Sequence, residues 1–344
     1  MKAIAKLVAL ACGTLALMHC AVPNLPDDEG DNSGSTGSGS PAGDAKLPPG
    51  SADAPASTPT TPGAPATPGM PGTPPGKQCD LSKPFQAPSL VAGLAPGQHY
   101  ATPRLSNDEL TVYFTMRDAN GKSRIGRAVR SSIATQFGAA TVLDAQSSTA
   151  KDNDPSVSAD GASLWFSSER DGANDKLYMA SLVPGTTTFG AAVPVTTIST
   201  GASAEDQHPY FRVSGGGELW FSSTRNGEWD IFVAKKNGAG FDAPKRVEEL
   251  HATAATRQPM VTEDGLGILF ASERVGGLGQ RDLWTATRAS VASSFGAPVA
   301  LTAVNSAADE FAGFLSNDGC RVYFSSDRAV AKTHAVYVAE RPAK

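Results

Sequence analysis

The stretch PSVSADGASLWFSSERDGANDKLYM (residues 155–179) contains three short patterns that recur along the chain. A Pro is followed by Ser and then by an Asp-Gly pair, which is typical of a tight turn. An apolar-aromatic segment, residues 164–166, leads through a small polar pair to Arg170, and a second such segment occupies 176–179. Alternating side-chain character, with turn residues between the runs and no helical periodicity, indicates short β-strands.

The patterns recur in five units that account for residues 85–341. A Phe opens each unit, and the spacings between these residues are 52, 52, 52 and 54, at Phe85, Phe137, Phe189, Phe241 and Phe295. The turn pattern begins at Pro103, Pro155, Pro209, Pro259 and Gly313. Four strands per repeated unit of this length are typical of a β-propeller. We therefore predict an all-β fold, a five-bladed β-propeller of four-stranded blades.

The motifs Pro-x-x-Ser-x-Asp-Gly, Leu-x-Phe-Ser-Ser-x-Arg and Asp-Leu-Trp resemble the WD40-like repeat of the TolB-type propeller family, over residues 85–341. The resemblance implies the propeller fold and a role in the cell envelope. The chain departs from TolB itself by having five units where TolB has six blades. It also has no room for the α/β domain that precedes that propeller.

Ring closure follows from the order of the units. The last unit lacks an outermost strand, whereas the first has a spare one at residues 85–91, so we expect this N-terminal strand to complete the fifth blade. The turn that contains Cys320 would then lie on the same face as Cys79, and in an oxidising compartment we expect a Cys79–Cys320 disulfide.

The region before the repeats divides into two parts. Residues 1–20 have Lys2 and Lys6 before an apolar run, which is the shape of a signal peptide. Their end resembles a bacterial lipoprotein signal, which implies lipidation at Cys20 and, with Ala21 after it, the outer membrane; secretion without a lipid is the alternative. Residues 21–80 are rich in Pro, Gly, Ser and Thr and predict a disordered linker before a propeller domain at 81–344.

Most repeated residues have a structural interpretation. We assign the repeated Asp of the turns to local hydrogen bonds and the repeated Arg to blade contacts or solvated loops. Trp165, Trp220 and Trp284 are assigned to the core between blades.

The loops that enter the innermost strands differ from blade to blade, and they should meet at the mouth of the central channel. The candidate binding residues there are His99, Asp152, Asp154, Asp206, His208, Arg257 and Glu310. This set could hold a polar ligand or a divalent cation, although solvated loop residues would have the same sequence. No other cofactor is expected.

Composition and motifs limit the function. A net charge of −5 provides no basic field for nucleic acid, and short hydrolase, zinc and phosphate-loop motifs are absent from the repeats. We favour a monomeric, non-catalytic envelope scaffold that binds a protein or a polysaccharide, with membrane contact only through the lipid. The alternative is a carbohydrate-active enzyme using Asp152, Asp206 and Glu310. A Tol–Pal-like role follows only from the resemblance.

Overall fold

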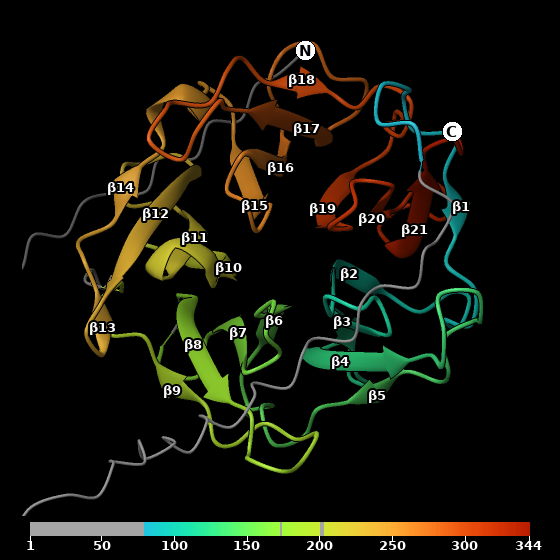
Figure 1. Cartoon of the computed structure of the whole chain (residues 1–344). Coiled ribbons are helices and arrows are strands. Elements are labelled where there is room, and N and C mark those ends of the chain that lie inside the picture. The colour runs from blue at the N-terminus through green and yellow to red at the C-terminus, as the bar shows by residue number, and fades with distance from the viewer. Residues whose placement is uncertain (1–78, 173, 200–202) are drawn as a thin grey trace, which may run out of the picture. The chain divides into compact units, whose positions relative to one another are not determined.

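Each repeat forms one antiparallel sheet, and the five sheets stand as blades around a common centre (Figure 1). The computed structural model describes residues 79–172, 174–199 and 203–344. Blade 1 contains β2 (Tyr100–Leu105), β3 (Thr111–Arg117), β4 (Ser123–Val129) and β5 (Thr141–Val142). Blade 2 contains β6 (Asp152–Val157), β7 (Ser163–Ser168), β8 (Lys176–Ser181) and β9 (Val193–Pro194).

The remaining blades follow the same order from the centre outward. Blade 3 contains β10 (Asp206–Arg212), β11 (Glu218–Ser223), β12 (Asp230–Asn237) and β14 (Lys245–Arg246), with β13 (Gly240–Phe241) also paired to β12. Blade 4 contains β15 (Thr256–Val261), β16 (Gly267–Ser272), β17 (Asp282–Thr287) and β18 (Val299–Ala300). Blade 5 contains β19 (Glu310–Leu315), β20 (Arg321–Ser326), β21 (Ala335–Glu340) and β1 (Ser89–Leu90). The predicted five-bladed propeller is confirmed.

Blade 5 is completed by the beginning of the domain, as the spare N-terminal strand predicted. In β1, Ser89 pairs with Val338 and Leu90 with Tyr337, both on β21. The sheet order β1-β21-β20-β19 joins the start and the end of the described chain in one blade. The ring therefore has no open junction between its first and last repeats.

The repeated aromatic and turn residues have the structural roles that the sequence predicted. The strand phenylalanines, such as Phe166, are fully buried, and Trp165, Trp220 and Trp284 are at most 6% exposed. In the turn of blade 2, the Ser158 hydroxyl donates to Asp160 Oδ1 at 2.6 Å. The same hydroxyl-to-Asp bond recurs in the turns of blades 1, 4 and 5. These carboxylates stabilise turns.

A bulge interrupts each innermost strand near its start, where the pairing register shifts. In four blades a residue other than Gly has a positive φ there, between 49° and 61°, at Thr102, Asp154, His208 and Gln258. A Pro follows each of these residues and cannot donate to the ladder. Bulges change the direction in which side chains point, so this position differs in orientation from the rest of its strand.

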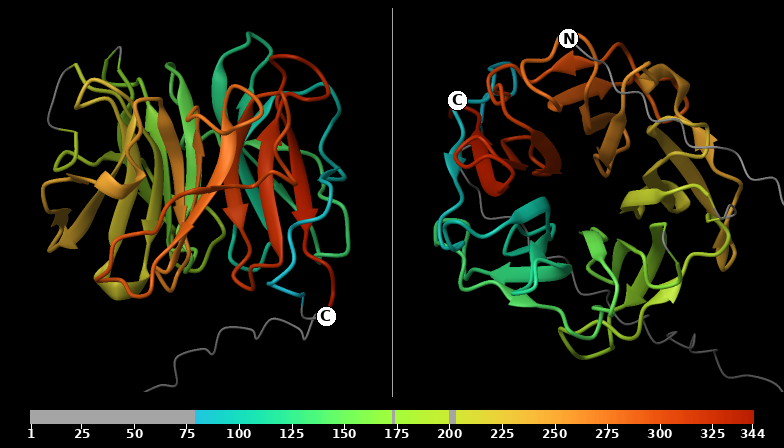
Figure 2. Two further views of the ribbon diagram at one scale, coloured as in Figure 1. Left: turned by 90° about the horizontal axis from the view of Figure 1, so that it is seen from above. Right: turned by 180° about the vertical axis from the view of Figure 1, so that it is seen from behind.

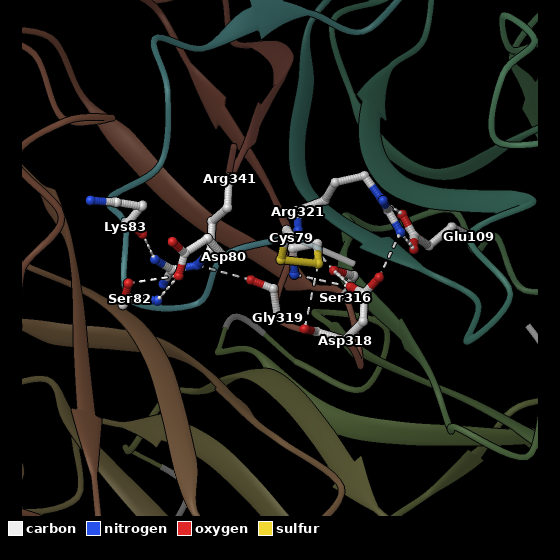
Figure 3. Close-up of a disulfide and its surroundings, with 11 residues drawn as sticks. Cys79, Asp80, Ser82, Lys83, Glu109, Ser316, Asp318, Gly319, Arg321 and Arg341 are labelled. Carbon is white, nitrogen blue, oxygen red and sulfur yellow. Dashed lines mark hydrogen bonds and ion pairs between the residues drawn. A yellow bond between two sulfur atoms is a disulfide. The ribbon is translucent and has the colours of Figure 1, made fainter. Parts of the chain in front are cut away.

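The predicted disulfide between Cys79 and Cys320 is present, with the two Cα atoms 5.6 Å apart (Figure 3). Cys79 also forms a β-bridge with Ala343, and the Asp80 N–H donates to the Pro342 carbonyl at 2.8 Å. The disulfide, the bridge and the β1–β21 pair thus hold the two ends of the domain together.

A charged contact links blade 5 to blade 1 close to the disulfide (Figure 3). Arg321 donates to both carboxylate oxygens of Glu109, at 2.6 and 2.7 Å. The Tyr323 hydroxyl donates to the same carboxylate at 2.8 Å. Bidentate pairs of this kind fix orientation as well as distance, so they hold the closing junction in register.

The predicted signal peptide (1–20), its Cys20 and residues 21–78 of the predicted linker lie outside the described residues. Within the described ranges, no helix has both the length and the apolar character needed to cross a membrane.

Replacing Cys320 with Ser should destabilise the domain without changing its architecture. The bridge closes a segment with a sequence separation of 241 residues, for which the chain-entropy model gives a loss of about 5.5 kcal/mol in the free energy of unfolding. Urea unfolding of C320S and of the double variant C79S/C320S should give equal losses. An unfolding free energy equal to that of the wild type would contradict this prediction.

Candidate functional site

Four of the five blade junctions share one backbone hydrogen bond. The first N–H of an innermost strand donates to the carbonyl of the residue before or at the start of the third strand in the preceding blade. The donor and acceptor pairs are Tyr100 and His334, Asp206 and Asp175, Thr256 and Trp229, and Glu310 and Arg281, at 2.7 to 3.0 Å. The same bond therefore brings together side chains that differ from one junction to the next.

These side chains interact in pairs across the junctions. Gln207 Nε2 donates to Asp175 Oδ2 at 2.5 Å. The Arg257 guanidinium lies over the Trp229 ring at 4.4 Å, and that of Arg281 over Phe311 at 4.1 Å. We call the following set the junction cluster, and the end of the ring where it lies the junction face: Asp175, Gln207, Trp229, Arg257, Arg281, Phe311 and His334.

His334 completes the cluster at the closing junction. Its ring stacks on Phe311, with centroids 4.0 Å apart, and meets His99 edge to face at 5.4 Å. Asp309, which binds Arg281 through both oxygens, approaches His334 Nε2 at 3.8 Å. The cluster therefore combines aromatic surface with both signs of charge.

A second polar group lies one residue deeper along the innermost strands, at the bulges. The Thr102 hydroxyl donates to Asp154 Oδ1 at 3.2 Å, and His208 Nε2 lies 3.6 Å from the same oxygen. The Ser167 hydroxyl donates to Asp154 Oδ2 at 2.9 Å. Asp154 thus contacts side chains of blades 1, 2 and 3. The buried Gln258 occupies the same position in blade 4.

Arg104 occupies the next level and reaches across the centre of the ring. Its guanidinium donates to the Gly313 carbonyl in blade 5 and to the Pro259 carbonyl in blade 4, and it lies over the Tyr210 ring of blade 3. Burial lowers the pKa of Arg104 to about 10, so it stays charged at neutral pH. This side chain therefore joins four blades at a level below the bulges.

Several buried polar atoms of this region have no hydrogen-bond partner within the described ranges. They are Asp175 Oδ1, His208 Nδ1, Arg257 Nε, Gln258 Nε2, Ser156 Oγ and both ring nitrogens of His334. Leaving a buried polar atom unpaired costs about 1–3 kcal/mol. Their concentration around one end of the centre marks a place where a ligand can supply partners.

Burial sets the protonation of two of these groups. It raises the pKa of Asp175 to about 7, assisted by the Asp154 charge and opposed by the Gln207 hydrogen bond. It lowers the pKa of His208 to about 4, since the Asp154 charge offsets the desolvation only in part. At neutral pH His208 is therefore neutral, and Asp175 is close to its midpoint.

The seven residues proposed from the sequence fall into two groups. Asp154, His208 and Arg257 lie together at the centre of the junction face, and His99 lies against His334 beside them. Asp152, Asp206 and Glu310 are instead at most 1% exposed and lie inside their blades. The structure therefore does not place these three carboxylates on an open rim.

Each of the three carboxylates is held by the repeated Arg of its own blade. Arg170 donates to Asp152 at 2.7 Å, Arg225 to Asp206 at 2.8 Å, and Arg328 to Glu310 at 3.0 Å. Each of these Arg side chains also donates to a carbonyl of the loop that enters the blade, at Gln146, Ile198 and Val304. Each Arg thereby links the entering loop to its own blade. Because the carboxylate is bound in this structural ion pair, it is not available to a ligand.

Sequence reasoning missed Trp229, Asp175 and Arg281. All three lie just before a third strand, at a position that also holds Ser123 and His334. This position changes in chemical type from unit to unit while its flanking strand stays apolar. An alignment of the five units shows this contrast, and it could have identified the position as a candidate for binding.

No group of three or more His, Cys, Asp or Glu side chains in the described part of the chain could hold a metal ion.

Comparisons with known proteins agree on the fold. No family model and no curated protein matches the chain. The catalytic domain of the Coprinopsis cinerea GH62 α-L-arabinofuranosidase is similar in structure, with 12% identity, 75% of this chain and 96% of that chain covered, and a TM-score of 0.50. TolB from Acinetobacter baumannii matches with 15% identity, 71% of this chain and 56% of that one, and a TM-score of 0.41. At 12% identity, the likeness to the arabinofuranosidase domain shows a shared propeller fold only.

Replacing Asp206 with Asn should lower stability, because Arg225 would lose its anionic partner inside the blade. Breaking a buried pair by changing one member costs about 3 kcal/mol or more. Thermal and urea unfolding would measure the loss, with Asp144→Asn, an exposed carboxylate, as the matched control. Equal stability of D206N and D144N would contradict the assigned role.

The stability of the domain should depend on His208 between pH 6.5 and 4. The unfolded chain binds a proton at His208 in this window and the folded chain does not, so the His208 contribution is lost as pH falls, by up to about 1.4 kcal/mol per pH unit. Asp175 acts in the opposite direction, because its raised pKa lets the folded state take up a proton first. The effect of His208 is therefore measured as the difference in pH dependence between the wild type and a His208 variant.

Urea unfolding at several pH values should show that His208→Gln loses less stability than the wild type on acidification from pH 6.5 to 4. Identical pH slopes for the two proteins would show that His208 is not kept neutral by the fold.

Proposed function

We propose that this chain is a non-catalytic binding scaffold that engages a partner protein through the junction face. The observation that carries the proposal is the distribution of residue types: equivalent positions within the blades are engaged in the fold, whereas the positions that differ between blades meet in the junction cluster with unpaired polar atoms. A rigid ring that presents varied side chains together is a common arrangement for binding.

Exposed aliphatic side chains on the same face favour a protein partner. Val275 and Leu278 lie in the β16–β17 loop, and Val330 lies in the β20–β21 loop; they are 102%, 58% and 56% exposed. Both loops emerge on the junction face, next to Arg281 and His334. Apolar side chains beside a polar centre suit contact with another protein.

The lipoprotein-like signal expected at residues 1–20 would bring this scaffold to the cell envelope, in agreement with the role that the TolB-type resemblance implies. The partner is then expected among exported or envelope proteins.

A carbohydrate-active enzyme is the second candidate, and one observation favours it. Asp175 has a buried oxygen without a partner, and burial and the nearby Asp154 charge raise its pKa to about 7, a value suited to a general acid. The carboxylates first considered for this role, Asp152, Asp206 and Glu310, are held in ion pairs. The enzyme would therefore have to use Asp154 and Asp175.

Substitutions on the junction face should abolish partner capture while substitutions on the opposite face should not. Val275→Asp/Leu278→Asp would be compared with Val129→Asp/Val183→Asp, whose side chains are similarly aliphatic and at least 39% exposed. Cross-linking and mass spectrometry on cells producing each full chain would identify the proteins captured by the wild type. We expect the amount of these proteins that is captured to fall at least tenfold in Val275→Asp/Leu278→Asp and to stay unchanged in Val129→Asp/Val183→Asp.

Equal capture by both variants would overturn the proposed docking face. Hydrolysis assays with arabinofuranosides and related glycosides would distinguish the carbohydrate-active enzyme from the binding scaffold. Activity that disappears in Asp175→Asn would replace the scaffold with the enzyme.

A further inference from the structure

Arg257 differs from the other junction residues because it has an aromatic partner and no anion. Its guanidinium lies 4.4 Å from the Trp229 ring centroid, and within residues 79–172, 174–199 and 203–344 it makes no hydrogen bond or ion pair. Arg281, at the next junction, has the same aromatic stacking but is bound by Asp309 through two contacts. The contrast between the two arginines points to a missing acceptor at Arg257.

The surroundings of Arg257 supply further unpaired groups. His208 and Gln258 are 6% and 0% exposed, and one side-chain nitrogen of each has no partner. The His208 ring lies against the same Trp229 that carries Arg257, with centroids 6.3 Å apart. Gln258 follows Arg257 directly and uses its oxygen to accept the Ala312 N–H, which leaves its NH₂ group free.

The charges near Arg257 leave room for an anion. Burial lowers the pKa of Arg257 and the nearby Arg281 guanidinium lowers it further, while Glu273, Glu205 and Asp154 act more weakly in the opposite direction. An anion bound at Arg257 would offset the effect of the Arg281 charge and supply the acceptors that Arg257 lacks. Arginine binds planar anions in a bidentate manner, which suits a carboxylate.

We propose that Arg257, supported by Trp229 and Gln258, binds a carboxylate of the partner polypeptide, from an acidic side chain or the C-terminus, flanked by apolar residues. This inference rests on the proposed function and specifies the chemistry that the junction face recognises.

A polypeptide is favoured over an acidic sugar for two reasons. The Arg257 guanidinium already covers a face of Trp229, and the His208 ring lies beside the indole with centroids 6.3 Å apart, so Trp229 offers little open surface for stacking a sugar ring. In addition, the β16–β17 loop carries the exposed Val275 and Leu278, and it starts next to Arg257, with the Glu273 N–H bound to the Ala255 carbonyl at 3.0 Å. Aliphatic surface of this kind matches apolar peptide side chains.

Selection from a random peptide display library on the full chain tests the proposal. We expect selected peptides to share an Asp, a Glu or a free C-terminus next to an apolar residue, and their affinity to fall at least tenfold when that carboxylate is converted to the amide. Arg257→Gln should cause a similar loss and Arg257→Lys a smaller one. Arg117→Gln, an exposed arginine on the same face, should leave the affinity unchanged.

Three outcomes would overturn the proposal: no peptide selected, selected peptides without a shared carboxylate, or binding unchanged in Arg257→Gln. Binding of oligogalacturonate in a manner dependent on Arg257, without peptide binding, would assign the subsite to an acidic sugar instead. Capture of a partner that depends on Val275 and Leu278 but not on Arg257 would leave the scaffold function standing and remove only the carboxylate subsite.

Discussion

The backbone hydrogen bond at the blade junctions determines how the rest of this ring is used. At four of the five junctions it joins the first N–H of an innermost strand to the carbonyl of the residue just before the third strand in the preceding blade. Because the bond involves only backbone atoms, it places no demand on the side chains of either residue. Gln207 with Asp175 and Arg257 with Trp229 could therefore diverge in chemistry while the blades kept the same spacing.

The hydrogen bond of the bulge N–H on the innermost strands is kept even where the residue that normally accepts it has changed. In three blades the N–H at the bulge donates to a hydroxyl of the preceding blade, for example from Asp154 to Thr115 at 2.8 Å. Blade 4 has Ala271 at the hydroxyl position, and Gln258 supplies the acceptor for the Ala312 N–H instead. The Gln258 oxygen is therefore committed to the fold while its nitrogen has no partner, so the substitute acceptor also leaves a free donor next to Arg257 in the chain.

The sequence alone predicted the fold, its closure by residues 85–91 and the Cys79–Cys320 bridge, because each follows from the regular spacing of repeats. It predicted the site only in part. Asp206 lies in a polar loop in the sequence, and nothing local shows that Arg225, 19 residues later, removes its carboxylate from the surface. Trp229 was overlooked because its partner Arg257 belongs to the next unit, so its role exists only once two blades meet.

The closure of the ring also determines the face of the propeller at which the described domain begins. Cys79 is bonded to Cys320 at the turn after β19, whereas Glu310, at the start of β19, borders the junction cluster. A strand of this length spans about 20 Å, so the chain enters the domain on the face opposite the cluster, beside the C-terminal residues (Figure 2). Cys79 thus lies away from Arg257 and Trp229. The disulfide therefore does more than close the ring, because it also fixes the start of the described domain on the face opposite the junction cluster.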